Sequence, residues 1–181
     1  MLIEASKACL LIVDMQERLL PVIHEAERVA DNCMVLLQAA EKLDLPIIMS
    51  EQYPKGLGPT VPELEHKNAM IFDKLAFSVW RSENLKSHLS KMEESGFKHV
   101  IIGGVEAHVC VLQSALDLAK AGFEVFVVAD AVSSREPEST DLALARMRAQ
   151  GVHVVNLEMA IFELAGKAGT PEFKALSALI K

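Results

Sequence analysis

The chain has 181 residues, of which 51% are hydrophobic and 24% charged, and it carries a formal net charge of −7. This composition excludes a disordered chain, a collagen-like protein and a small disulfide scaffold, and the acidic balance argues against binding to nucleic acid. With the 9 glycines counted and the single Tyr left out, the apolar share is roughly 55–56%, against a usual ~45–50%. Two explanations remain open: an unusually thick core, or a core plus a buried subunit interface.

Short apolar runs alternate with longer segments whose apolar residues recur at helical spacing. In chain order, the pattern predicts a strand over 8–13, a helix over 27–43, strands over 45–49 and 69–72, a helix over 84–95, a strand over 99–102, a helix over 109–121, a strand over 124–129, a helix over 137–150, a strand over 152–155, and short helices over 157–165 and 171–180. The longest predicted loop, 51–67, carries three prolines and two glycines. A loop of that length is usually functional or mobile.

Continuously apolar strands separated by helices indicate parallel βαβ units with both faces of the sheet covered. The right-handed crossover rule then favours an open, doubly wound sheet. We therefore predict an α/β protein, a three-layer α/β/α sandwich on a six-stranded parallel sheet. No linker or repeat interrupts the pattern, so a single domain over 1–181 is expected.

Membrane and redox signals point to a cytoplasmic protein. No apolar run approaches the roughly 18 residues that span a bilayer, so no membrane partner is expected, and residues 1–15 do not resemble a signal peptide. The three cysteines, Cys9, Cys33 and Cys110, contain no Cys-x-x-Cys pair. This usage is typical of a reducing compartment.

Ligands of open parallel sheets bind outside the carboxyl ends of the strands, so the residues that leave each strand are the informative ones. Asp14 follows the first strand, Lys74 follows the third, and Cys110 follows the fourth after a double glycine. Cys110 lies near the start of a helix, a position expected to lower the pKa of a thiol and favour a nucleophilic thiolate. The alternative for Cys110 is a small buried hydrophobe, which is the reading that fits Cys9 and Cys33.

These residues and their surroundings resemble the isochorismatase-like cysteine hydrolase family. The matching segments are Leu-Leu-Ile-Val-Asp-Met-Gln (10–16), Lys-Leu-Ala-Phe-Ser-Val-Trp (74–80), Gly-Gly-Val-Glu-Ala-His-Val-Cys-Val (103–111) and Ala-Asp-Ala-Val-Ser-Ser-Arg (129–135). The resemblance implies a catalytic triad of Asp14, Lys74 and Cys110. It also implies a cis peptide bond joining Val105 to Glu106, with the backbone N–H groups of Glu106 and Cys110 forming an oxyanion hole.

Departures from the family pattern indicate a subgroup. Isochorismatases proper have glycine where this chain has Cys110, so hydrolysis of isochorismate is not expected. Nicotinamidases carry an Asp-x-His…His metal set in the loop after the second strand, where this chain has only His66. We therefore expect no metal and no cofactor, and the chain looks like the isochorismatase domain-containing subgroup. The family commonly forms dimers or tetramers, which implies a homo-oligomer.

Six side chains are expected to wall a pocket for a small-molecule substrate: Gln16, Gln52, Tyr53, Phe77, Trp80 and His108. For Phe77 and Trp80 the alternative is ordinary core packing. For His108 the alternative is a hydrogen bond to backbone within its own turn.

The leading hypothesis is a metal-independent cysteine hydrolase that cleaves a small amide-like or other C–N bond through a thioester on Cys110. A second hypothesis is a catalytically silent interaction or scaffold protein that retains the fold. A third is a redox-sensing thiol protein, which would gain support from a Cys110–Cys33 disulfide. The apolar excess also predicts a subunit interface on the terminal helices, which carry Leu157, Met159, Ile161, Phe162, Leu164, Phe173, Leu176, Leu179 and Ile180.

Overall fold

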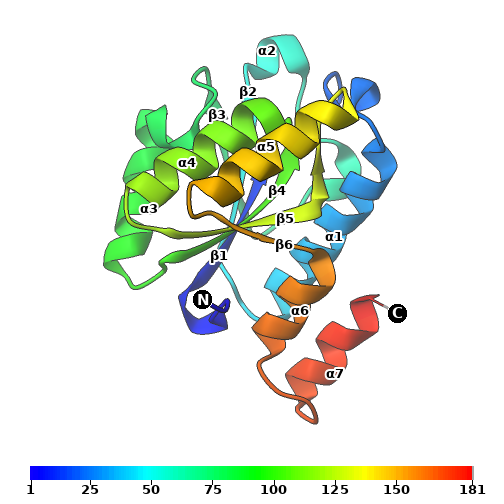
Figure 1. Ribbon diagram of the computed structural model, residues 1–181, viewed down its shortest axis with the longest axis vertical. Coiled ribbons are helices and arrows are strands. Elements are labelled where there is room, and N and C mark those ends of the chain that lie inside the picture. The colour runs from blue at the N-terminus through cyan, green and yellow to red at the C-terminus, as the bar shows by residue number, and fades with distance from the viewer. Residues whose placement is uncertain (181) are drawn as a thin grey trace.

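The computed structural model describes residues 1–180 and contains a six-stranded parallel sheet (Figure 1). The strand order is β3-β2-β1-β4-β5-β6. The strands are β1 (Ala8–Val13), β2 (Ile47–Gln52), β3 (Ala69–Lys74), β4 (His99–Val105), β5 (Glu124–Ser133) and β6 (His153–Val155). The chain runs outward from β1 to β3, crosses back to the centre, and then runs outward from β4 to β6. This order confirms the doubly wound prediction.

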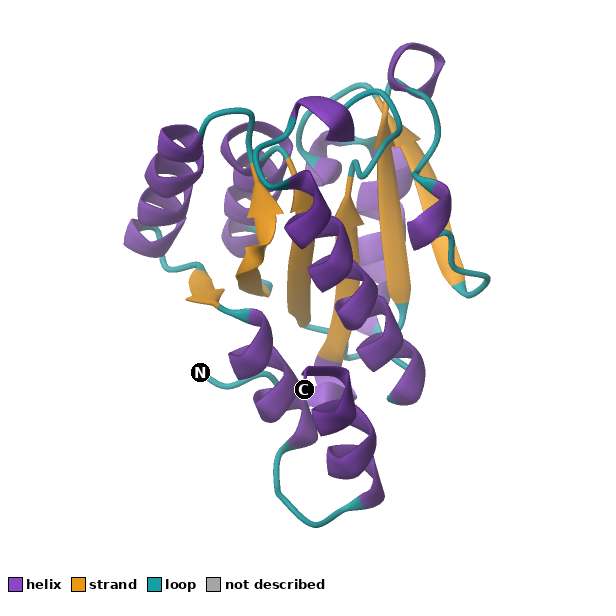
Figure 2. Cartoon of the chain, turned by 90° about the vertical axis from the view of Figure 1, so that its right-hand side faces the viewer, coloured by secondary structure: helices purple, strands orange, loops and turns teal. Residues whose placement is uncertain are grey.

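Helices cover both faces of the sheet, which confirms the three-layer sandwich (Figure 2). One face is covered by α1 (Ala26–Lys42) and α6 (Leu157–Ala165), with α7 (Pro171–Ser177) packed on those two helices. The other face is covered by α3 (Glu83–Glu94), α4 (Leu112–Lys120) and α5 (Pro137–Ala149).

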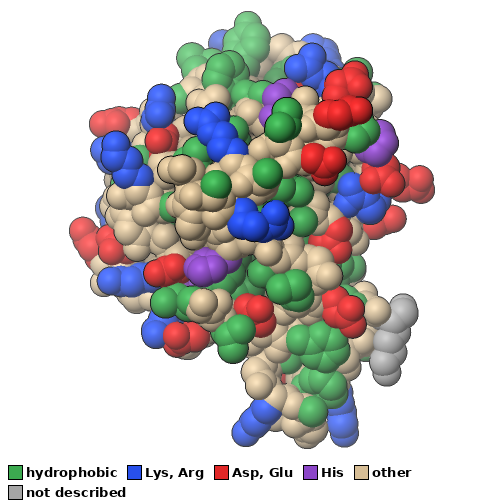
Figure 3. Space-filling view, viewed as in Figure 1, with side chains coloured by type: hydrophobic (Ala, Val, Ile, Leu, Met, Phe, Trp, Pro, Cys, Tyr) green, Lys and Arg blue, Asp and Glu red, His purple; other side chains and the backbone are tan. Residues whose placement is uncertain are grey.

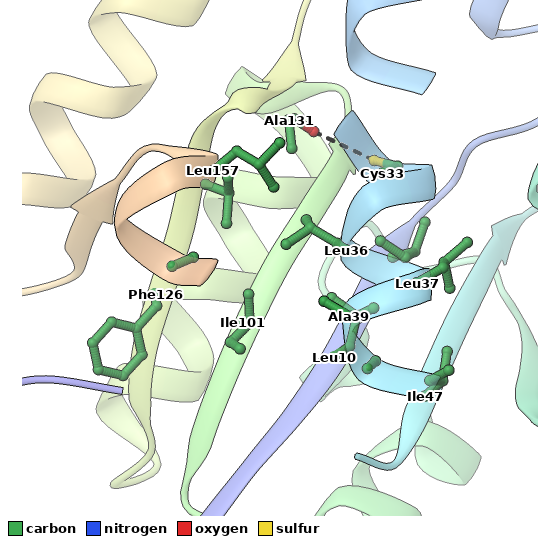
Figure 4. Close-up of a cluster of buried hydrophobic side chains, with 14 of the residues drawn as sticks. Leu10, Cys33, Leu36, Leu37, Ala39, Ile47, Ile101, Phe126, Ala131 and Leu157 are labelled. Atoms are coloured by element: carbon green, nitrogen blue, oxygen red, sulfur yellow. Dashed lines mark hydrogen bonds between the residues drawn. The ribbon is translucent and has the colours of Figure 1, made fainter. Parts of the chain in front are cut away.

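The central strands are buried on both faces, so they are apolar at every position rather than at alternate ones. All six residues of β1 are buried, with Leu10 and Ile12 facing α1 and Leu11 and Val13 facing the opposite helices. Figure 4 shows the α1 face of this core, where helix side chains such as Leu36 pack onto the sheet. Continuous burial is one reason that the composition is unusually apolar.

Several elements are longer or more ordered than predicted, and all of them lie at the carboxyl edge of the sheet. β2, β3 and β5 continue beyond the apolar runs into polar residues and end at Gln52, Lys74 and Ser133, while β4 continues through two glycines to Val105. The predicted loop 51–67 contains the short helix α2 (Pro54–Leu57) and a 3₁₀ turn (Pro62–Leu64). The predicted helix 109–121 is divided into a π-helical turn (Ala107–Val111) and α4. The apolar runs in the sequence end before these elements do, because polar residues and glycines replace apolar residues there.

The C-terminal helices use most of their apolar residues inside this chain. Leu157, Ile161, Leu164 and Leu176 are buried against the α1 face of the core. Met159 and Phe162 remain 47% and 45% exposed, and hydrophobic side chains gather over this projecting helix pair (Figure 3). The core therefore accounts for part of the apolar excess, and an exposed apolar surface on α6 remains.

Gly104 is the position where the sheet most requires a glycine. Its φ is +112°, and an added Cβ would overlap the backbone of Val13 on the neighbouring strand. We predict that Gly104→Ala lowers the free energy of unfolding by more than about 2 kcal/mol in urea denaturation. Gly122→Ala is the matched control, because Gly122 has φ +101° but open space around its Cβ position. It should cost only about 1 kcal/mol, and equal losses in the two variants would contradict the overlap at Gly104.

Candidate active site

The switch point of the sheet lies between β1 and β4, where the chain leaves in opposite directions. Asp14 directly follows β1, and the segment from Glu106 to Cys110 directly follows β4. β2 and β3 end beside them with Gln52 and Lys74. The topology therefore brings a carboxylate, an ammonium and a thiol to one edge, as the sequence predicts.

Asp14 and Lys74 form an ion pair that is fully buried. Lys74 Nζ lies 2.7 Å from Asp14 Oδ2, and both side chains are 0% exposed. Ser50 Oγ donates to the other carboxylate oxygen, Oδ1, at 2.7 Å. Burial raises the pKa of Asp14 above its ordinary value, while the Lys74 ammonium and the Ser50 hydroxyl oppose that rise. Asp14 also has a left-handed backbone, with φ +51°, which turns its side chain out of the strand direction.

Gln52 completes the surroundings of the ammonium. Its side-chain oxygen, Oε1, accepts a hydrogen bond from Lys74 Nζ at 2.7 Å. The same oxygen lies 4.0 Å from Cys110 Sγ, within reach of a weak S–H···O contact. Gln52 therefore lies in contact with both the ammonium and the thiol.

Cys110 lies in the π-helical turn and is 6% exposed. Burial and the nearby Asp14 carboxylate raise the pKa of its thiol to about 12, and Lys74 only partly opposes them. The prediction of a lowered thiol pKa is therefore wrong for the free protein. A position near a helix start does not compensate for burial beside a carboxylate. Cys110 is protonated at rest and needs a base to become a nucleophile.

The turn before Cys110 is tied to the segment that follows β5. The peptide bond between Val105 and Glu106 is cis. The Glu106 carboxylate pairs with Arg135 Nε at 2.9 Å, and the ring Nδ1 of His108 lies 2.8 Å from Ser134 Oγ. The motif 129–135 thus supplies the residues that hold the Cys110 turn. His108 bonds to a side chain on a neighbouring segment, whereas the alternative from the sequence was a bond to backbone within its turn.

The structure shows the burial or the contacts of four of the six predicted pocket residues. Gln16 is 0% exposed and donates to the backbone oxygens of Gln52 and Gly58, so it braces the loop after β2. Tyr53 and Phe77 are 52% and 51% exposed near the ends of β2 and β3. Trp80 packs edge-on against Phe123, which fits the core-packing alternative for this residue.

A cavity of about 530 Å³ lies beside β3. Lys74 is the one residue of the buried pair that lines it, and Asp14 and Cys110 are not among its walls. Its walls include Tyr53, Leu75, Ala76, Arg81 and Asn84. The side of the site that faces β3 therefore offers room for a ligand, and Tyr53 is the predicted pocket residue that lines it.

Ser50 is the contact that sequence reasoning missed. It precedes Glu51-Gln52 in β2, and its register partner in β1 is Val13, directly before Asp14. The parallel pairing of these two strands would have revealed the contact, but register is not readable from a short apolar run.

Other features of the described residues bear on the alternatives. Within residues 1–180, no group of three His, Cys, Asp or Glu side chains is arranged to hold a metal ion. No helix in that range is long and apolar enough to cross a membrane. Cys33 and Cys110 pack into cores on opposite faces of the sheet, so the sheet separates the two thiols that the redox hypothesis would join.

The topology and the polar groups at its switch point define a doubly wound α/β protein with a polar site at the carboxyl edge of its sheet. A family model described as the isochorismatase domain matches residues 8–159, and the chain therefore belongs to the isochorismatase family. Isochorismatase domain-containing protein 2 of Danio rerio is 42% identical over 171 residues, which cover 94% of this chain and 85% of the relative.

Two solved structures superpose over nearly the whole chain. The MAR1 ribonuclease of Caenorhabditis elegans gives a TM-score of 0.91 at 37% identity, covering 99% of this chain and 92% of its own. The YcaC gene product of Escherichia coli, described as an octameric hydrolase of unknown specificity, gives a TM-score of 0.90 at 28% identity. That match covers 99% of this chain and 89% of the other. These likenesses confirm the family resemblance seen in the sequence.

The protonated state of Cys110 predicts how it is alkylated. Far below the pKa of about 12, the thiolate fraction rises about tenfold per pH unit, so the iodoacetamide rate should rise without a plateau from neutral pH to roughly pH 10. Mass spectrometry of the Cys110 peptide measures the rate, with Cys110→Ala as the blank. Asp14→Asn should speed alkylation at a given pH, because it removes the carboxylate that raises the thiol pKa and keeps Lys74. A plateau near pH 7 in the unsubstituted protein would contradict this assignment.

Proposed function

We propose that this protein is a metal-independent cysteine hydrolase that cleaves an amide-like or other C–N bond of a small molecule. The observation that carries the proposal is the buried Asp14–Lys74 pair at 2.7 Å beside a thiol at the switch point of the sheet. A carboxylate next to a protonated thiol is a base next to a nucleophile, which is the arrangement that nucleophilic catalysis needs.

In the first step, Asp14 takes the proton of the Cys110 thiol while Sγ attacks the carbonyl carbon of the substrate. The C–S bond forms and the carbonyl electron pair moves to oxygen, where the backbone N–H groups of Glu106 and Cys110 would stabilise it. The tetrahedral intermediate then collapses and the C–N bond breaks. Protonated Asp14 gives its proton to the leaving nitrogen, and an acyl thioester remains on Cys110.

In the second step, Asp14 takes a proton from water while the water oxygen attacks the thioester carbon. The C–S bond breaks, the carboxylic acid leaves, and the proton on Asp14 returns to the thiolate. Lys74 keeps its charge throughout and stabilises whichever neighbour is anionic, the carboxylate of Asp14 or the thiolate of Cys110. The cycle is balanced, with water as the only co-substrate.

The scaffold hypothesis accounts less well for the buried charges. Removing two charges from water costs several kcal/mol per ion, and a purely structural core is often as stable with apolar residues of the same volume. A chain selected only as a scaffold has no evident use for Asp14, Lys74 and Cys110 in contact. The hydrolase proposal gives each of them a task.

A substrate screen tests the proposal. We predict turnover of at least one member of a panel of small amides, carbamoyl compounds and esters, reduced by at least about 10³-fold in Cys110→Ala and in Asp14→Asn. An RNA arm is included because the Caenorhabditis elegans neighbour is described as a ribonuclease. No turnover of any substrate by a folded protein, together with a stable protein partner in pull-downs, would favour the scaffold hypothesis. Turnover retained in Cys110→Ala would exclude the thioester route.

We also propose that the protein forms a homo-oligomer. The exposed apolar residues Met159 and Phe162 on α6 support a contact there, and the Escherichia coli neighbour is described as octameric. Light scattering at micromolar concentration should give a mass of at least two chains, and Phe162→Glu should lower it. Leu142→Glu is the matched control, because Leu142 is an exposed apolar residue on α5, across the sheet from α6. A monodisperse monomer would overturn the proposal.

A further inference from the structure

The side chain of Gln52 is bonded to the protein at both its oxygen and its nitrogen, and it lies between Lys74 and Cys110. Its oxygen accepts from the Lys74 ammonium at 2.7 Å and lies 4.0 Å from the sulfur of Cys110. Its nitrogen, Nε2, donates to the backbone oxygen of Leu75 at 2.8 Å. These bonds orient the amide through the protein itself, whether or not a substrate contacts its second N–H. The prediction that Gln52 lines the substrate pocket stays a prediction, and its bonds to Lys74 and Leu75 point to a second role.

The orientation of the Gln52 amide is fixed by its partners. The Leu75 carbonyl can only accept a hydrogen bond, and the Lys74 ammonium can only donate one. The amide nitrogen must therefore face Leu75 and the amide oxygen must face Lys74. A flipped amide would place its N–H groups against the Lys74 ammonium, donor against donor, and its oxygen against the Leu75 carbonyl, acceptor against acceptor.

The backbone of Gln52 is held as firmly as its side chain. Gln16 Oε1 accepts from Gln52 N at 2.7 Å, and Gln16 Nε2 donates to Gln52 O at 3.0 Å. Gln16 thus pairs with Gln52 as a neighbouring strand would, and a third bond ties it to the Gly58 oxygen at 2.7 Å. Since Gln16 is 0% exposed, these bonds are shielded from water.

We propose that Gln52 is a positioning residue that holds the Lys74 ammonium between Asp14 and Cys110, and that its lack of charge leaves the ammonium free to stabilise a thiolate. The proposal rests on the hydrolase function proposed above. It assigns to Gln52 a task in the reaction that does not involve touching the substrate.

The argument for neutrality is a count of charges. At rest, Asp14 and Lys74 carry one charge each and Cys110 carries none, so the group is neutral overall. After the proton moves from Cys110 to Asp14, the ammonium faces a thiolate and the group is still neutral. A carboxylate at position 52 would add a negative charge in both states. It would pair with the ammonium and repel the thiolate, because like charges disfavour each other's charged form.

The variants Gln52→Glu and Gln52→Met separate the effect of a charge at position 52 from the effect of losing the amide. Both variants lose the donor to Leu75, and only Gln52→Glu adds a charge. At a fixed pH, Gln52→Glu should slow iodoacetamide alkylation of Cys110 by about tenfold or more, whereas Gln52→Met should not slow it. Both should lower turnover, because neither holds the ammonium as the amide does. Gln38→Glu, at an exposed position of α1, is the control for an added charge and should change neither quantity.

The alkylation readout needs no substrate, so it distinguishes the two proposals. Slower alkylation in Gln52→Glu alone supports the role of Gln52 even if no substrate is found in the screen. Unchanged alkylation in both variants, or equal slowing in both, would overturn it, since a merely structural residue would not distinguish Glu from Met. Circular dichroism and thermal melting establish that each variant is folded. If Gln52→Glu fails to fold, turnover by Gln52→Met becomes the test of holding the ammonium: lower turnover supports the role, and unchanged turnover overturns it.

Discussion

The buried ion pair between Asp14 and Lys74 is the interaction on which the rest of the site depends. Removing one member of such a pair typically costs about 3–5 kcal/mol, because the other charge is left buried without a partner. The pair is tolerable only with further hydrogen bonds: Ser50 donates one to the carboxylate, and Gln52 accepts one from the ammonium. These four residues lie on, or directly after, three adjacent strands, β1, β2 and β3. The contacts of the site therefore depend on the register in which these strands pair.

The same pair determines the state of Cys110. A thiol beside a carboxylate in a buried site stays protonated, and a thiol beside an ammonium ionises, so the balance between Asp14 and Lys74 decides which occurs. The high thiol pKa shows that burial and the carboxylate dominate at rest. A protonated thiol is poorly reactive towards oxidants and stray electrophiles, since the thiolate is the reactive form. In the proposed mechanism, proton transfer to Asp14 would couple activation of the nucleophile to the arrival of a substrate carbonyl.

The sequence was sufficient for the topology and for the residues where strands end, but not for contacts across the sheet. Runs such as 8–13 reveal buried parallel strands, and the polar residues that follow each run mark the edge where Asp14 and Lys74 meet. Ser50 and the loop-bracing role of Gln16 depend on strand register and loop path, which periodicity does not contain. The thiol pKa was predicted with the wrong sign because helix position is visible in a sequence and burial beside a specific carboxylate is not. Trp80 is predicted to wall the pocket, with core packing as the alternative, and its ring packs on Phe123.

The apolar composition and the polar site are two consequences of one architecture. A parallel sheet covered on both faces leaves little room in its central strands for polar side chains, so polar burial concentrates where the strands end. Most of the buried polar residues lie at the carboxyl edge: Asp14, Gln16, Ser50, Glu51, Thr60, Lys74, Ser133 and Ser134. There they bond mainly to one another and to loop backbone, as Glu51 does with Thr60 and Ser133 with His24. Since each of these groups would be costly without its partner, the network that orders the loops also fixes the geometry of Cys110.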